Sequence, residues 1–244
     1  PPYIEAYYKY YKRSYKLREE ANSTSHSFLH GIAQDRIYHS APPVPLFYLL
    51  KERYNTEGYI FCYMRSFIAV DVRNPQMEQV LEGLGSLGAG VKVVASENLH
   101  LTLKFLGEVD PGRVNEIYGA MEEAFGFCSP FQGGLRGLGA FPSLGRMRVV
   151  WVGFSEGRER ILEMQGRLEG ALARLGFRPE GRPFDPHLTI GRVKSPKGKE
   201  ELRAFVLAHQ ATDLGTFAVE LVELKESTLT PKGPIYKTLK AYSL

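Results

Sequence analysis

The stretches His100-Leu-Thr-Leu103 and His187-Leu-Thr-Ile190 decide the fold predicted for this 244-residue chain. Successive side chains of a β-strand point to opposite faces, so the histidine and threonine of each stretch project together. The aliphatic residues between and after them project to the other face. Each stretch therefore predicts a strand that is half core and half site.

The repetition of this pattern separates it from a chance match. One His-x-Thr on a strand is usually structural, but only about 0.2 such matches are expected at random in a chain with six histidines. The other histidines have no comparable context: His26, His30, His39 and His209. The two motifs lie 87 residues apart (187 − 100), which favours an internal duplication.

The elements around the motifs alternate from Met64 onward. Strands are predicted over 65–72, 91–95, 99–106, 131–141, 148–154, 187–193, 217–228 and 235–242, and helices over 75–87, 111–125, 157–175 and 199–208. Two helix-strand halves, each with one His-x-Thr strand, indicate an α+β fold and not a parallel doubly wound sheet. No Gly-x-Gly-x-x-Gly follows a predicted strand and no Gly-x-x-x-x-Gly-Lys-Ser/Thr occurs, so mononucleotide and dinucleotide cradles are not indicated.

Composition bounds the class of protein. With 43% hydrophobic and 24% charged residues the chain has the profile of a soluble globular protein, and neither a membrane span nor a signal peptide is predicted, so we expect a cytoplasmic location. Cys62 and Cys128 form no Cys-x-x-Cys and predict no metal site. The net charge of +4 is compatible with a polyanionic partner and too small to demonstrate one.

The first 63 residues differ from the rest and hold eleven of the fourteen tyrosines. We predict an N-terminal extension over 1–63, with a helix near 4–20 and a loop over 41–45, and an independent domain over 64–244 that starts at Met64. The extension is a packing helix, a flexible appendage, the result of a start placed too far upstream, or a partner-binding or RNA-contacting arm. The last reading rests on the alternation of aromatic and basic residues over 7–18.

Two imidazoles that flank one phosphate suit transfer at phosphorus. A neutral imidazole accepts a proton from the attacking oxygen, and a protonated one donates to the leaving oxygen; a pKa near 6.5 allows both forms near neutrality. Threonine hydroxyls donate to the non-bridging oxygens. This chemistry needs no metal ion.

The paired motifs resemble the signature of the 2H phosphoesterases. His100–Val109 and Pro186–Arg192 are similar to the RNA 2',3'-cyclic phosphodiesterases, also called 2'-5' RNA ligases, and the likeness extends to Phe67–Asp71, Phe141-Pro142, Arg148–Trp151 and Gly233–Tyr236. It covers about residues 64–244. The resemblance implies a bilobal, pseudo-two-fold fold in which two antiparallel sheets face a central cleft with helices outside.

The resemblance also implies roles. His100 is expected to protonate the leaving 3'-oxygen and His187 to activate water, while Thr102 and Thr189 hold the phosphate; the reverse ligation would exchange the two histidine roles. The product would carry a 2'-phosphate. The implied partner is RNA or an oligonucleotide with a 2',3'-cyclic phosphate, with no cofactor, no metal and no membrane, and we expect a monomer.

Further site candidates surround the motifs. Arg192 would emerge opposite His187 on a regular strand, but a bend at Gly191 would bring it to the phosphate. Lys104 shares parity with His100, and Phe105, Trp151 and Phe184 are candidates for stacking on a base, with core packing as the alternative. A rim for the RNA backbone, or simply solvated loop charge, is predicted at Arg178, Arg182, Lys194, Lys197 and Lys199.

Other functions stay open at this point. The enzyme class includes phosphodiesterases that act on another cyclic or 2'-5' linked nucleotide. A non-catalytic RNA-binding module would keep the geometry without turnover. A third possibility is a metal held by the histidines, against which stands the absence of Asp or Glu within either motif.

Overall fold

The computed structural model describes residues 52–54, 60–88, 90–231 and 233–244. The helix predicted near 4–20 and the loop over 41–45 lie outside the described residues. One compact unit spans Lys51–Leu244 and includes a small hairpin of β1 (Glu52–Tyr54) and β2 (Ile60–Cys62) ahead of Met64. The boundary at Met64 stays a prediction.

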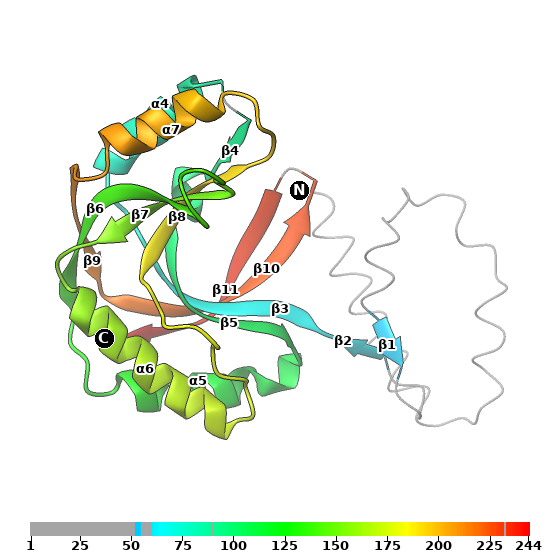
Figure 1. Cartoon of the computed structure of the whole chain (residues 1–244). Helices are drawn as coiled ribbons and strands as arrows, with labels where there is room; N and C mark the ends of the chain where they lie inside the picture. Colours follow the sequence, from blue (N-terminus) through cyan, green and yellow to red (C-terminus); the bar gives the residue numbers. More distant parts are fainter. Residues whose placement is uncertain (1–51, 55–59, 89, 232) are drawn as a thin grey trace, which may run out of the picture. The chain divides into compact units, whose positions relative to one another are not determined.

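The predicted alternation of helices and strands recurs in the structure (Figure 1). The remaining strands are β3 (Met64–Asp71), β4 (Val91–Val93), β5 (His100–Val109), β6 (Phe131–Phe141), β7 (Val149–Phe154), β8 (His187–Val193), β9 (Asp213–Val219), β10 (Leu221–Thr230) and β11 (Gly233–Ser243). The described helices are α4 (Gln76–Ser86), α5 (Val114–Phe125), α6 (Arg158–Arg174) and α7 (Lys199–Ala208).

The large sheet is antiparallel and has the strand order β11-β10-β3-β5-β8-β7-β6-β9, with β4 paired to β8. Its two central strands, β5 and β8, share one residue pair, Leu101 with Leu188. We call β11-β10-β3-β5 the first lobe and β8-β7-β6-β9 with β4 the second lobe. The expected α+β fold with two antiparallel sheets is confirmed, and the two sheets are continuous through this pair.

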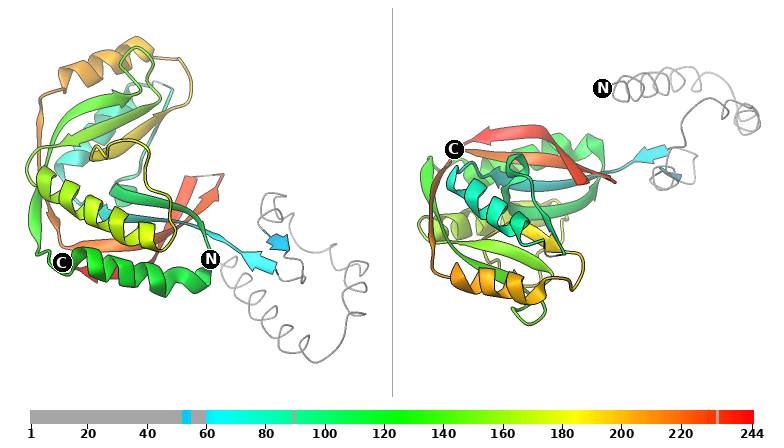
Figure 2. Two further views of the ribbon diagram at one scale, coloured as in Figure 1. Left: turned by 60° about the horizontal axis from the view of Figure 1, so that its bottom comes forward. Right: turned by 90° about the horizontal axis from the view of Figure 1, so that it is seen from above.

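The helices cover the lobes in pairs. α5 and α6 pack together against β11 and β5, while α4 and α7 lie against β4, β9 and β6 (Figures 1 and 2). α6 shows why such a helix forms: its apolar residues Ile161, Met164 and Leu168 recur at helical spacing and are buried. It ends before Gly176, whose φ of 82° is the left-handed conformation that glycine adopts without steric cost.

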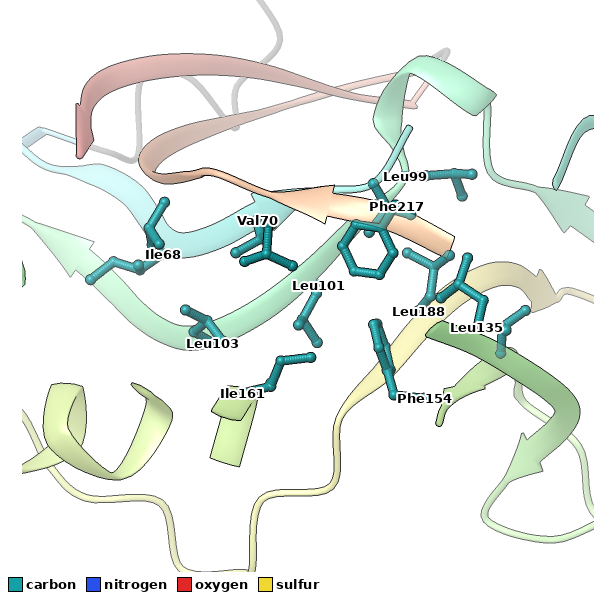
Figure 3. Close-up of a cluster of buried hydrophobic side chains, with 14 of the residues drawn as sticks. Ile68, Val70, Leu99, Leu101, Leu103, Leu135, Phe154, Ile161, Leu188 and Phe217 are labelled. Atoms are coloured by element: carbon teal, nitrogen blue, oxygen red, sulfur yellow. The ribbon is translucent and has the colours of Figure 1, made fainter. Parts of the chain in front are cut away.

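The aliphatic halves of both motifs lie in the core (Figure 3). Leu101 and Leu103 from β5, and Leu188 and Ile190 from β8, are at most 2% exposed. Burying one such side chain contributes roughly 1.5–3 kcal/mol. The predicted division of each motif into a core face and a site face is confirmed on the core side.

The single strand predicted over 217–228 is wrong. The segment forms two strands that are separated at Glu220. The first, β9, pairs with β6 in the second lobe, and the second, β10, pairs with β3 in the first lobe. Buried residues alternate at Phe217 and Val219, then at Val222 and Leu224. This change from odd to even positions marks the break between the two strands. The residues on both sides of the break favour β-structure, which is why a single strand was predicted.

Among the residues that the structure describes, no helix has the length and apolar character that a membrane crossing requires.

Candidate active site

The four polar residues of the motifs meet at the centre of the sheet. Because Leu101 pairs with Leu188 in antiparallel register, the residues on either side of this pair come into opposition: His100 beside Thr189, and Thr102 beside His187. All four side chains are half-buried on the face opposite the core. The predicted convergence of the two motifs is therefore what the sheet produces.

Both imidazoles are held in the same way. Nδ1 of His100 lies 2.7 Å from the backbone oxygen of Asn98, and Nδ1 of His187 lies 2.8 Å from that of Asp185. A carbonyl oxygen only accepts, so each Nδ1 carries a proton. Nε2 of each ring is then left with a lone pair in the neutral form and a proton in the charged form, as acid-base work requires.

His100 sits in an aromatic enclosure. The rings of Phe67 and Tyr236 lie 5.0 and 5.1 Å from it, the second edge-on. This burial lowers the pKa of His100 below its ordinary 6.5, against the opposing effect of the hydrogen bond with Asn98. The positive charges of Lys225 and Arg192 act in the same direction as burial. In the free protein the neutral imidazole is thus favoured.

A buried ionic cluster lies beside His100. Asp71 is its neighbour across β3 and β5, and the ammonium of Lys225, 7% exposed, pairs with Asp71 and with Glu223 at 3.0 Å. Burial raises the pKa of Asp71 despite the lysine. Sequence reasoning missed this cluster, because β10 contains charged and hydroxyl residues beside its apolar ones and Lys225 does not stand out among them.

The second lobe surrounds His187 differently. The ring centroids of Phe141 and His187 lie 5.0 Å apart in an edge-to-face arrangement, and those of Phe141 and Trp151 lie 5.2 Å apart. The indole covers Gly139, where a Cβ would come within 2.3 Å of the ring, so only glycine fits beneath it. Trp151 Nε1 is buried without a hydrogen-bond partner among the described residues. Trp151, Phe141 and His187 thus form a row of contacting rings, which we call the aromatic row, with Phe141 in the middle.

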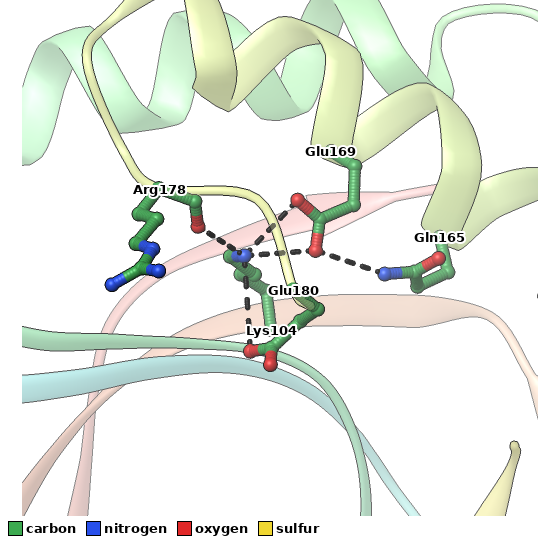
Figure 4. Close-up of polar contacts among 5 residues, drawn as sticks. All are labelled: Lys104, Gln165, Glu169, Arg178 and Glu180. Carbon is green, nitrogen blue, oxygen red and sulfur yellow. Dashed lines mark hydrogen bonds and ion pairs between the residues drawn. The ribbon is translucent and has the colours of Figure 1, made fainter. Parts of the chain in front are cut away.

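The parity prediction for Lys104 is wrong. The register of β3 and β5 skips Leu103, because Ile68 pairs with Lys104 and Ala69 with Thr102. This β-bulge turns Lys104 to the helix side, where its Nζ lies 2.8 and 3.0 Å from the carboxylate oxygens of Glu169 and 2.8 Å from the Arg178 backbone oxygen (Figure 4). Lys104 is 4% exposed and does not face the histidines.

The same bulge turns Phe105 to the histidine side. Its ring is 58% exposed and lies 6.2 Å from that of Phe67, the neighbour of His100. A large exposed aromatic ring next to a polar site is the arrangement that base stacking uses.

A second bulge repeats the feature after the second motif. Ile190 is skipped, since Val150 pairs with Gly191 and Trp151 with Thr189. Gly191 then faces the helix side, where a Cβ would lie 2.8 Å from Val91, and Arg192 turns to the histidine side. The exposed Arg192 influences the pKa of both His100 and Tyr236, so the predicted bend at Gly191 brings it toward the site.

Phe184 is less available than predicted. Its ring is partly buried against the core and borders a small recess of about 130 Å³ with Glu169 and Arg182. Within the described part of the chain, no group of three or more His, Cys, Asp or Glu side chains is arranged to hold a metal ion.

Comparisons with known proteins agree with this geometry. The model of the family "LigT like Phosphoesterase" matches the chain twice, over residues 70–151 and 152–236, once for each motif. The RNA 2',3'-cyclic phosphodiesterase of Methanothermobacter thermautotrophicus is 38% identical over 74% of this chain and 99% of its own length; that of Archaeoglobus fulgidus is 40% identical over 73% and 99%.

Solved structures give the same answer. E. coli LigT complexed with 3'-AMP superposes with a TM-score of 0.58 at 26% identity, covering 75% of this chain and 98% of that one. TT0787 of Thermus thermophilus gives 0.57 at 30% identity, covering 74% and 98%. The fold and site therefore define a duplicated two-histidine phosphoesterase. The chain belongs to the LigT-like phosphoesterase family.

Proposed function

We propose that the protein hydrolyses RNA 2',3'-cyclic phosphate ends to 2'-phosphates. Water attacks phosphorus, the bond from phosphorus to the 3'-oxygen breaks, and the 3'-hydroxyl leaves. The observation that carries this proposal is the pair of imidazoles on one face of two adjacent strands, with no hydrogen-bond partner for either Nε2 among the described residues. The relatives in Methanothermobacter and Archaeoglobus bear the name of this activity, and E. coli LigT has been solved with 3'-AMP, a nucleotide with a ribose phosphate.

One histidine takes the water proton and the other gives a proton to the 3'-oxygen. Both proton transfers start from Nε2, because Nδ1 of each ring is held by a backbone oxygen. Thr102 and Thr189 lie between the imidazoles and donate to the non-bridging oxygens, where negative charge grows. Arg192 adds positive charge at the same phosphate.

The family pattern assigns the acid to His100 and the base to His187. The lowered pKa of His100 makes its protonated form the minor one near neutrality in the free protein. A bound phosphate anion opposes this effect, since a neighbouring negative charge favours the imidazolium. On this assignment the substrate itself helps to protonate the acid. The reverse reaction, a 2'-5' ligation, exchanges the roles.

The aromatic side chains are proposed to hold the base. Phe105 offers an exposed face beside the first motif, and Trp151 lies in the row beside the second. Lys104 is no longer a candidate for contacting the RNA, because it pairs with Glu169. Phe184 is a weaker candidate than Phe105, because its ring packs against the core. That the enzyme acts as a monomer in the cytoplasm stays a prediction from the sequence.

The test is incubation of the full chain with a short RNA that ends in a 2',3'-cyclic phosphate. We expect a 2'-monophosphate product, with activity that persists after extended chelation and needs no nucleoside triphosphate. Phosphorus NMR of the product distinguishes the 2'- from the 3'-monophosphate. An intact substrate, or activity that returns only with added divalent metal, would overturn the proposal.

A further inference from the structure

A basic recess lies at the far end of β8, away from both histidines. It has a volume of about 310 Å³, within the range of ligand sites, and opens between the loop joining β6 to β7 and the segment leading from β8 into α7. These segments lie side by side (Figures 1 and 2), and Val193 N donates to Arg148 O at 2.9 Å. Its apolar floor includes Met147 and Leu202.

Five cationic side chains line this recess, and no carboxylate does. They are Arg146, Arg148, Lys194, Lys197 and Lys199, and all five are exposed. None of them has an ion pair within the described residues, whereas Lys104 and Lys225 each pair with a carboxylate. Charge gathered in a concave site without a counter-charge attracts an anion.

The neighbouring helix adds to this field. α7 begins at Lys199 beside the recess, and its N-cap Gly198 provides no side-chain hydrogen bond to the first turn. The free backbone N–H groups at a helix N-terminus favour negative charge. The acidic residues there are Glu200 and Glu201, of which Glu200 lies 4.0 Å from Arg203.

The recess lies on a line from the catalytic face. Arg192 points to the histidine side, and Lys194 directly follows Val193, the last residue of β8, so the strand that carries the second motif leads from the histidines to the recess. Lys194 lies five positions after Thr189, which corresponds to at most about 16 Å at roughly 3.3 Å per residue. A stacked nucleic-acid strand rises about 3.4 Å per nucleotide, so this span corresponds to roughly five nucleotides.

We propose that this recess binds a backbone phosphate of the RNA, a few nucleotides on the 5' side of the cyclic end. The inference rests on the proposed function, because it takes the 3'-terminal phosphate to lie between His100 and His187. Lysine and arginine contacts to phosphate hold a strand without reading its sequence. The enzyme should therefore favour oligonucleotides over a cyclic mononucleotide without favouring a particular sequence.

The test compares two substrates, a uridine octamer with a 2',3'-cyclic end and 2',3'-cyclic UMP. The variant Arg146→Gln/Lys197→Gln/Lys199→Gln removes three charges from the recess. The control Arg160→Gln/Arg167→Gln/Arg174→Gln removes three from the exposed face of α6. We expect kcat/KM for the octamer to fall about tenfold in the recess variant. The salt slope of octamer binding should decrease by about 0.7 for each phosphate that the variant no longer neutralises.

The mononucleotide is too short to reach the recess and serves as the internal reference. Equal losses for both substrates, no loss for the octamer, or an equal loss in the control variant would overturn the inference. Octamer binding measured by fluorescence anisotropy separates the two proposals. If no substrate is hydrolysed, the proposed function fails, and the anisotropy difference between the recess variant and the control still decides the role of the recess.

Discussion

Each of the two lobes presents one histidine and one threonine to the site, and the surroundings of these two residues differ between the lobes. Each motif strand carries a histidine, a threonine and a β-bulge one position later. The residue across from the histidine is Asp71 in the first lobe and Gly153 in the second. The residue after the bulge is the buried Lys104 in the first lobe and Gly191 in the second. The next residue is Phe105 in the first lobe and Arg192 in the second.

This difference separates the two histidines chemically. His100 is enclosed by aromatic rings next to an ionic cluster, and its pKa is lowered by burial. His187 lies beside Phe141, with glycine in the place of Asp71. A duplicated geometry thus places two equivalent Nε2 atoms at one phosphate, while unequal surroundings allow one to act as acid and the other as base.

Removal of either imidazole should have the largest effect. His100→Ala and His187→Ala should each reduce kcat on a cyclic-phosphate dinucleotide at least about a hundredfold, because each removes one of two proton transfers. Steady-state rates with circular dichroism as the folding control measure this effect. A folded variant with near wild-type turnover would show that its lobe contributes no proton transfer.

Lys104, which follows the bulge of the first lobe, should matter for stability. Lys104→Met leaves Glu169 without its cation, and we expect a loss of about 2 kcal/mol in the free energy of unfolding, below the roughly 3–5 kcal/mol of a fully buried pair, because Glu169 reaches solvent. The double variant Lys104→Met/Glu169→Leu should recover most of this loss. Denaturant titration measures both variants, and an unchanged unfolding free energy for Lys104→Met would contradict the pairing.

The hydroxyls should matter less than the imidazoles. Thr102→Ala and Thr189→Ala each remove one hydrogen bond to a charged oxygen, which corresponds to about a tenfold loss of kcat/KM. Serine at either position should restore most of the rate. A similar loss in the alanine and serine variants would indicate that the methyl group, and not the hydroxyl, is what the site needs.

The smallest effect should come from the N-terminal segment, which lies outside both lobes in the sequence. We propose that a chain starting at Met64 is stable and hydrolyses a cyclic-phosphate dinucleotide within about twofold of the full rate, since both motifs and all strands of the large sheet follow that residue. An RNA-contacting arm would instead appear as weaker, less salt-dependent binding of longer RNA. Insolubility or collapsed dinucleotide turnover would refute the independent domain.

Much of this fold could be predicted from sequence. Period-two alternation identified the strands around His100 and His187, and helical spacing with Gly176 as the stop identified α6. The alternation rule placed side chains on the wrong face of the sheet after a bulge, because a bulge inserts one extra residue into the strand. A bulge leaves no mark in an apolar run, so Lys104 was assigned to the wrong face, whereas Gly191 gave a cue for Arg192.

Long-range pairing was the other limit. Lys225 meets Asp71 across 154 positions, and only the register of β10 with β3 brings them together. The recess beside Arg146 and Lys197 likewise depends on two loops that sequence cannot place side by side. Local chemistry was therefore predictable at the motifs, and the surroundings that make the lobes unequal were not.

The division of labour between the lobes is tested most directly by a substrate with sulfur in place of the bridging 3'-oxygen. A thiolate leaves without a proton because a thiol has a pKa near 8.5, far below that of an alcohol, so this substrate needs no general acid. We predict that His100→Ala recovers most of the wild-type rate on it and that His187→Ala stays slow. An equal response of the two variants, rescued together or not at all, would contradict the account.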